Sequence, residues 1–122
     1  MFTIKEDLSI HATRGDIVYF SVTADDDGVP YKFQAGDVLR LTVVKKKDYA
    51  SIVMEKDFGV VAETETVDMF LSSEDTKIGK AISKPTDYWY EVVLNPDTMP
   101  QTIIGHDETG AKVFKLYPEG GD

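Results

Sequence analysis

The sequence predicts an all-β domain of short antiparallel strands, closed as a sandwich or a barrel. Two strings carry most of this prediction: Gly15-Asp16 leads directly into Ile17–Val22, and Gly36-Asp37 leads into Val38–Val43. In both runs apolar residues alternate with more polar ones, which is typical of a strand with one buried and one solvated face. The turn formers of Asp25–Pro30 lie between the runs, and this alternation of turns and strands is typical of antiparallel sheets.

The first three strands follow from this pattern. Residues 8–12 alternate and form a short first strand, and residues 16–24 and 37–46 form the second and third. Phe20 and Leu41 each occupy the middle of the more apolar face of their strand. We therefore expect both side chains in the core.

The fourth and fifth strands are shorter. Residues 49–56 form the fourth strand, which pairs with the third in a hairpin through the charged turn 45–48. Residues 57–66 are polar and mixed, and Asp57-Phe58-Gly59 is expected to break the strand. Val67, Met69 and Leu71 then alternate and indicate a fifth strand over 67–71.

A short helical turn is expected near residues 73–80. Ser72 followed by Asp75 resembles a capping box, in which side chains at the start of a helix bind backbone N–H groups. Gly79 and Pro85 end the segment after one or two turns.

The strand at 88–94 is the most aromatic of the chain. Tyr88, Tyr90, Val92 and Leu94 share one face, while Trp89 lies on the other. Because the first face is more apolar, we expect Tyr90 and Val92 in the core.

The last two strands are expected at 102–105 and 112–117, paired through the turn 107–110. Residues 118–122 lack periodicity and are expected to form a short disordered tail. No repeat or linker divides the sequence, so residues 1–122 are expected to form a single domain.

Composition limits the classes of function. The chain has no cysteine, which excludes disulfides and thiolate metal ligands. Its formal net charge of −9 disfavours nucleic acid and anionic membranes as partners. No apolar stretch approaches the roughly 20 residues of a membrane helix. The first residues lack the apolar core of a secretory signal, so we expect none.

Two short motifs have a structural explanation. Asp25, Asp26 and Asp27 are consecutive, whereas a calcium loop spreads its ligands over about twelve residues. A hairpin turn is therefore favoured over a metal site. Arg14-Gly15-Asp16 matches a tripeptide that adhesion receptors bind, but its position at the start of a strand favours a turn.

Nothing in the sequence predicts catalysis. His11 and His106 are the only histidines, and neither belongs to a metalloprotease, nucleophile-elbow or phosphate-loop motif. We therefore expect no enzyme activity, no catalytic residues, no cofactor and no metal.

An aromatic surface is the candidate interaction site. Trp89 points outward, and Tyr49 and Tyr117 could lie near it. Such rings could form a platform for a sugar. The favoured interpretation is that Trp89 is covered by residues 72–86 or lies at a subunit contact, to which residues 57–66 could also contribute.

The sequence also resembles the small structural proteins of phages and prophages of Gram-positive bacteria, in particular the N-terminal domain of the baseplate upper protein family. The resemblance spans residues 9–118. It rests on the succession of Arg14–Asp16, the acidic turn before Pro30-Tyr31, Gly36-Asp37, Lys45–Lys47, Leu71–Thr76, Tyr88–Val92, Thr102-Ile103 and Phe114–Leu116.

The resemblance implies an Ig-like β-sandwich without catalytic residues. It also implies a virion tail or baseplate component, made in the bacterial cytoplasm, that binds copies of itself or other virion proteins. The alternative function is a carbohydrate-binding or adhesin module that uses Trp89 and nearby tyrosines. A hydrolase is the least favoured hypothesis.

Overall fold

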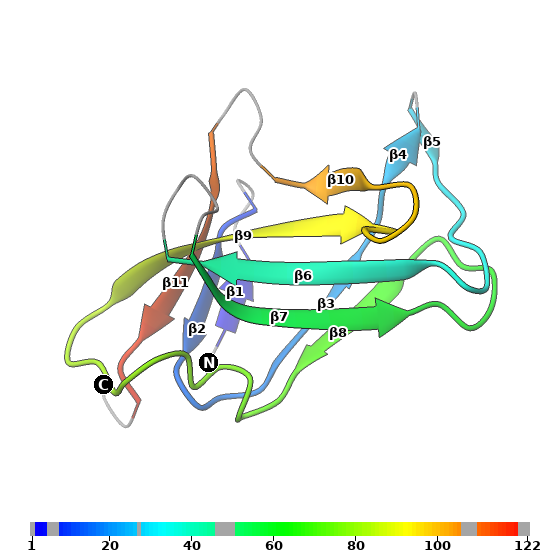
Figure 1. Cartoon of the computed structure of the whole chain (residues 1–122). Helices are drawn as coiled ribbons and strands as arrows, with labels where there is room; N and C mark the ends of the chain where they lie inside the picture. The colour runs from blue at the N-terminus through cyan, green and yellow to red at the C-terminus, as the bar shows by residue number, and fades with distance from the viewer. Residues whose placement is uncertain (1, 5–7, 27, 46–50, 106–109, 120–122) are drawn as a thin grey trace.

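The computed structural model describes residues 2–4, 8–26, 28–45, 51–105 and 110–119. These residues form an all-β domain of two packed layers, without a helix (Figure 1). The strands are β1 (Phe2–Ile4), β2 (Ile10–Thr13), β3 (Val18–Val22), β4 (Asp25–Asp26), β5 (Val29–Pro30), β6 (Val38–Val44), β7 (Ile52–Gly59), β8 (Val67–Leu71), β9 (Thr86–Leu94), β10 (Gln101–Ile104) and β11 (Lys112–Tyr117).

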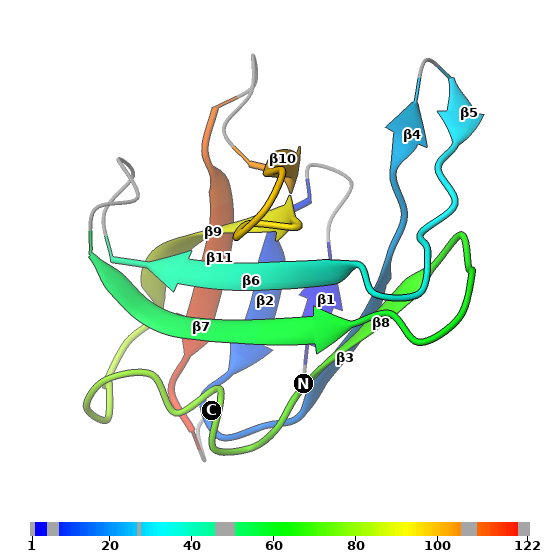
Figure 2. The ribbon, with the colours of Figure 1, turned by 45° about the vertical axis from the view of Figure 1, so that its right-hand side comes forward.

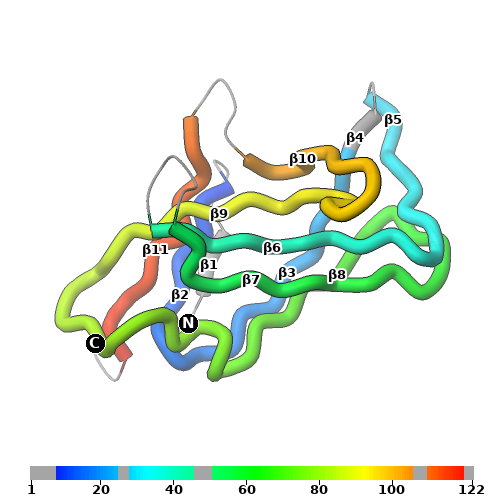
Figure 3. The backbone as a smooth tube through the Cα atoms, in the orientation of Figure 1, coloured from blue at the N-terminus to red at the C-terminus, as the bar shows by residue number. Residues whose placement is uncertain are grey.

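The larger sheet has the strand order β1-β2-β11-β9-β6-β7, with β10 as a further partner of β9. In Figures 1 and 2 its β6–β7 end crosses the direction of β11 and β2 steeply, because sheets twist and curl. The smaller sheet is β3 paired with β8, in register from Val18–Leu71 to Val22–Val67. The tube in Figure 3 shows the chain leaving β7 in one sheet and entering β8 in the other.

This pairing confirms the all-β, sandwich-like prediction. In an Ig sandwich strand B pairs with E, and strand F lies between C and G. Here β3 pairs with β8, and β9 lies between β6 and β11. One pair departs from the antiparallel expectation: β11 runs parallel to β2, from Phe114–Ile10 to Tyr117–Thr13. Alternation within a strand does not report the direction of its neighbour, so the sequence could not reveal this pair.

The core lies between the two sheets. The four side chains singled out from the sequence, Phe20, Leu41, Tyr90 and Val92, are all buried in it. The alternation on β3, β8 and β9 therefore gave the correct face for each strand. Phe33 and Ile78 are also buried in this cluster although they belong to connections; they lie outside any alternating run.

Strand β7 is longer than expected. Residues 57–59 were predicted as a break but continue the pairing with β6, with Asp57 opposite Arg40 and Phe58 opposite Leu39. Arg40 Nε donates a hydrogen bond of 2.7 Å to Asp57 Oδ1. This cross-strand ion pair offsets the low strand propensity of aspartate. Residues 49 and 50 of the predicted strand lie outside the described residues.

The helical turn expected at 73–80 is confined to residues 72–77, where Thr76 N donates to Ser72 O and Lys77 N donates to Glu74 O. The capping-box bonds form as expected: Ser72 N donates to Asp75 Oδ2 at 2.9 Å, and Asp75 N donates to Ser72 Oγ at 3.2 Å. The chain does not continue as a helix, because Gly79 takes a positive φ of 63°.

The C-terminal pair is arranged differently from the prediction. Strands β10 and β11 both pair with β9, against residues 92–94 and 86–90 respectively. The predicted turn 107–110 lies outside the described residues except for Gly110. Of the predicted tail, Pro118 and Glu119 are described, and the Glu119 carboxylate pairs with Arg14 at 2.5 Å; residues 120–122 lie outside the described residues.

The turn predicted at 25–30 is a hairpin of β4 and β5 with Asp25 opposite Pro30. In Figures 1 and 2 this hairpin projects from one end of the sandwich. Strand β10 and the C-terminal end of β9 lie at this same end of the sandwich. The β1 strand was not predicted.

Candidate functional site

Two of the three residues of the candidate aromatic surface, Trp89 and Tyr117, lie within the described residues. Tyr49 lies outside them. Trp89 is half-buried, with Val44 and Val113 as its cross-strand neighbours. The Tyr117 hydroxyl lies 3.0 Å from His11 Nδ1, and the two rings stack with centroids 6.0 Å apart.

Trp89 and Tyr117 share the outer face of the large sheet but are separated along it. Val113 is the partner of Trp89, and Tyr117 follows four residues later on the same strand, a distance of about 13 Å at strand rise. The fully buried Val44 lies next to Trp89 on this outer face. The indole therefore belongs to a small apolar cluster of its own.

The Arg14-Gly15-Asp16 tripeptide is a structural turn. Asp16 N donates to Thr13 O at 3.0 Å, and Gly15 takes a φ of 89°. The Arg14 side chain is buried, and its guanidinium donates to Gly79 O at 2.7 Å and to Glu119. A receptor that reads an extended arginine could not reach this group.

Among the described residues, no cluster of three or more His, Asp or Glu side chains is placed to hold a metal ion, and His106 lies outside these residues. No helix that could cross a membrane occurs in the described ranges.

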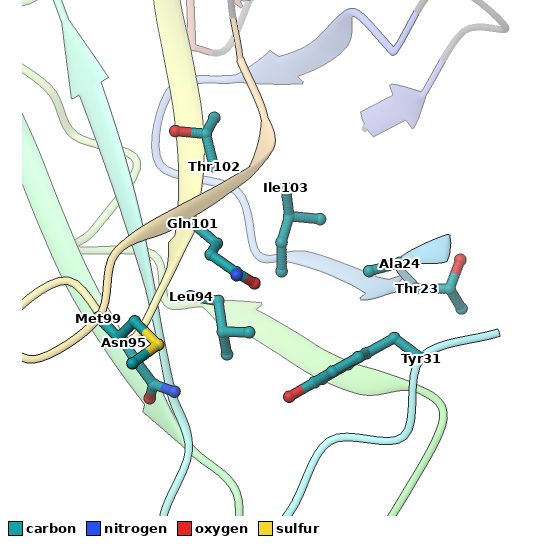
Figure 4. Close-up of a pocket in the computed structure, with 9 residues that line it drawn as sticks. All are labelled: Thr23, Ala24, Tyr31, Leu94, Asn95, Met99, Gln101, Thr102 and Ile103. Atoms are coloured by element: carbon teal, nitrogen blue, oxygen red, sulfur yellow. The ribbon is translucent and has the colours of Figure 1, made fainter. Parts of the chain in front are cut away.

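A pocket of about 470 Å³ lies at the end of the sandwich that carries the β4–β5 hairpin (Figure 4). Two connections contribute its described lining: the one between β3 and β6, and the one that leads from the end of β9 into β10. Its described lining comprises Thr23, Ala24, Tyr31, Leu94, Asn95, Met99, Gln101, Thr102 and Ile103.

The nine described lining residues combine polar and apolar side chains, and none of these nine is charged. Hydroxyls come from Thr23, Tyr31 and Thr102, and carboxamides from Asn95 and Gln101. In Figure 4 the Tyr31 ring extends across the lower part of the pocket, and the Gln101 side chain points toward its centre. The sequence alone gave no signal for the site, since Tyr31 and Gln101 lie 70 positions apart.

Hydrogen bonds hold both walls of the pocket. Tyr31 N donates to Ala24 O at 2.8 Å, and the Tyr31 ring packs edge-on against the buried Phe33 ring at 5.1 Å. On the other wall, Asn95 Oδ1 accepts from Val38 N at 2.9 Å, and Asn95 Nδ2 donates to Asp37. Asn95 is also one of two non-glycine residues described with a positive φ, at 49°, a conformation that asparagine tolerates well.

A second surface lies on the outer face of the small sheet. Tyr19 on β3 and Phe70 on β8 are direct cross-strand partners, and the exposed Ile17 lies two residues before Tyr19, next to the start of β3. They are 51%, 42% and 56% exposed. We name these three residues the outer strip, and an exposed apolar group of this kind marks an interaction surface more often than a single exposed residue does.

The outer strip is bordered by a charged group. Asp68 accepts a hydrogen bond of 2.7 Å from the Ser21 hydroxyl. Hydrogen bonds from Ser21 and Tyr19 lower the pKa of Asp68, and the bond to Asp68 raises the pKa of the Tyr19 phenol. The Asp68 carboxylate is therefore ionised at neutral pH beside the exposed rings.

Glu91 lies on the outer face of the large sheet, between the buried Tyr90 and Val92. Its neighbour across the strands is Thr42, and Gly105 lies so close that a Cβ there would be 3.7 Å from Glu91 Cβ. Burial raises the pKa of the Glu91 carboxyl. A carboxylate in this position is costly when ionised.

Comparisons of the chain with protein-family models, with curated proteins and with solved structures found no match.

Proposed function

We propose that this chain is a non-enzymatic structural component of a phage or prophage tail that acts by binding a neighbouring subunit. The observation that carries the proposal is the outer strip, in which the cross-strand partners Tyr19 and Phe70 and the adjacent Ile17 all expose apolar side chains. The resemblance to the baseplate upper protein family supports the same class of function. In this proposal the chain is made in the bacterial cytoplasm and incorporated into the virion.

The partner that suits this face is a different tail subunit with an apolar patch and a basic rim. The chain carries a net charge of −9, so two copies repel each other while a basic surface is attracted. The ionised Asp68 borders the strip and offers a partner for such a rim. Tyr and Phe are both enriched in the buried centres of protein interfaces, and Tyr is also among the residues that dominate binding energy.

The partner is expected on the face of the small sheet rather than at the nearest strand edge. Lys56 on the edge strand β7 points its ammonium toward β8 and donates to Phe70 O at 2.9 Å. This occupies a backbone acceptor that an added strand would need. The side chains of the outer strip remain accessible beyond it.

The proposal is tested on tail particles of the phage or prophage that encodes the chain. We expect mass spectrometry of purified particles to detect the chain. A zero-length carbodiimide cross-linker is expected to join Asp68 to a lysine of another tail protein. Tyr19→Lys, which places a positive charge against the apolar patch of the partner, is expected to reduce incorporation at least tenfold.

The matched control is Ser83→Lys, which adds the same charge at an exposed position remote from the strip in sequence. It is expected to be incorporated at the normal level. Circular dichroism must show that both variants are folded. Absence of the chain from the particles, or normal incorporation of Tyr19→Lys, would contradict the proposal.

A further inference from the structure

We infer that the pocket between the β3–β6 and β9–β11 connections binds a saccharide, as a site separate from the outer strip. Its volume of about 470 Å³ lies within the range of small-ligand sites in proteins. The inference does not depend on the proposed tail function, since the pocket belongs to this chain alone.

The chemistry of the lining selects an uncharged, hydroxyl-rich ligand. None of the nine lining residues of Figure 4 carries a charge, although charged residues make up 29% of the chain. Carboxamides and hydroxyls both donate and accept hydrogen bonds, which matches sugar hydroxyls that also do both. Anionic ligands are disfavoured by the negative field of the whole chain.

The pocket also offers the apolar surface that one face of a sugar ring needs. A pyranose ring exposes C–H groups on its faces and hydroxyls around its edge. The Tyr31 ring, Leu94 and Ile103 supply apolar contacts, while Gln101 supplies a hydrogen-bonding carboxamide beside them. Gln101 does not use its side chain in a hydrogen bond within the described residues, so this group is available to a ligand.

The site is preorganised, which lowers the entropy lost when a ligand binds. The Tyr31 ring is fixed against the buried Phe33, with 5.1 Å between ring centroids. Asn95 is fixed by bonds to Val38 and Asp37. Met99 is 72% exposed at the mouth of the pocket, where its flexible side chain can adapt to a ligand.

The location in the fold supports the same inference. The connections that form the pocket correspond to the B–C and F–G loops of an Ig sandwich, because β3, β6, β9 and β11 take the places of strands B, C, F and G. In variable Ig domains these two loops lie together at the ligand-binding end. Here the β4–β5 hairpin and β10 are inserted into the same two connections.

The test uses the purified chain with two probes: a glycan array, and methyl glycosides of common hexoses, 6-deoxyhexoses and N-acetylhexosamines in saturation-transfer NMR. We expect at least one saccharide to bind. Tyr31→Ala and Gln101→Ala are each expected to weaken that binding about tenfold, which equals about 1.4 kcal/mol. Gln101→Trp, which fills the pocket from an exposed position, is expected to abolish it.

Two control variants locate the site. Trp89→Ala removes the aromatic residue that the sequence suggested for sugar binding, and Tyr19→Ala removes a ring of the outer strip. Both are expected to bind the saccharide like the unaltered chain. Because Tyr31→Ala could lose stability, Gln101→Trp provides an independent test at a residue that supports no core contact.

Three results would overturn the inference: no saccharide binds at millimolar concentration, Gln101→Trp binds normally while folded, or Trp89→Ala abolishes binding. The first two would leave the proposed tail function untouched, because that function depends on Tyr19 and is measured by incorporation into particles.

Discussion

Lys56 and Asp75 join the edge of the large sheet to the turn that follows β8, with Nζ of the lysine 2.6 Å from Oδ2 of the aspartate. Lys56 lies on β7 between Met54 and Phe58, on the side of the strand that faces the core. Its ammonium also lies 5.7 Å from the centroids of the Phe58 and Phe70 rings. The half-buried Lys56 ammonium therefore links the large sheet to β8 of the small sheet and to the turn that follows it.

Lys56→Met is expected to destabilise the domain by about 1–3 kcal/mol, since hydrogen bonds to charged groups contribute in this range. Urea denaturation measures the change. The matched control is Lys77→Met, whose lysine pairs with the exposed Glu74 at 3.9 Å; it should cost less than about 0.5 kcal/mol. Equal losses in the two variants would contradict the role given to Lys56.

Asp75 is expected to make the domain sensitive to acid. Burial tends to raise the pKa of its carboxyl, but hydrogen bonds from Lys56 and Ser72 outweigh burial and lower the pKa below its usual 3.8. A lowered folded-state pKa stabilises the domain above pH 3.8, and this stabilisation is lost as the pH falls through the folded-state value.

Asp75→Asn should therefore lower the melting temperature at pH 7 and reduce its dependence on pH between 5 and 2.5. The melting temperature measured across this range by circular dichroism checks the prediction. An unchanged slope would show that other carboxylates, such as the Asp57 bound to Arg40, dominate acid unfolding.

Glu91 is expected to act in the opposite sense. Burial raises the pKa of its carboxyl above the usual 4.5, so the folded state holds this proton more tightly than the unfolded state. The contribution to stability is complete below pH 4.5 and is lost as the pH rises through the folded-state pKa. Glu91→Gln should therefore raise the melting temperature at pH 7.5 and leave it nearly unchanged at pH 4; a fall at pH 7.5 would refute this account.

Phe20 and Tyr19 are neighbours on β3 that face opposite sides of the small sheet. Phe20 is 8% exposed in the core, so Phe20→Ala is expected to cost about 3–5 kcal/mol. Tyr19→Ala, at a 51% exposed position, should cost less than about 1 kcal/mol. Guanidinium denaturation distinguishes the two, and the reverse order would mean that β3 presents its other face to the core.

The sequence predicted those features of the fold that depend only on the residues of one strand, such as which of its faces is buried. Alternation placed Phe20, Leu41 and Tyr90 in the core, because a side-chain period of two assigns every other residue to one face. It could not reveal that β11 lies parallel to β2, because pairing direction depends on distant segments. The alternation pattern also missed Phe33 and Ile78. Both residues lie in connections between strands and are buried by tertiary packing.

The candidate sites were beyond the reach of sequence patterns for the same reason. Trp89 was a reasonable candidate as the only tryptophan on an outward face, but its strand neighbours cover part of it. Tyr31 and Gln101 meet only because the β3–β6 and β9–β11 connections lie at one end of the sandwich. Tyr19 and Phe70 become a shared surface only through the register of β3 with β8.

The parallel pair of β2 and β11 has a consequence for how the domain is made on the ribosome. Residues 10–13 are synthesised early, but their partners at 114–117 emerge about a hundred residues later. Contacts at such separation slow folding, because the intervening chain must be ordered before they form. The β6–β7 and β3–β8 pairs can assemble during synthesis, while β2 waits with an unpaired edge, and the nascent domain completes its large sheet only after β11 has left the exit tunnel.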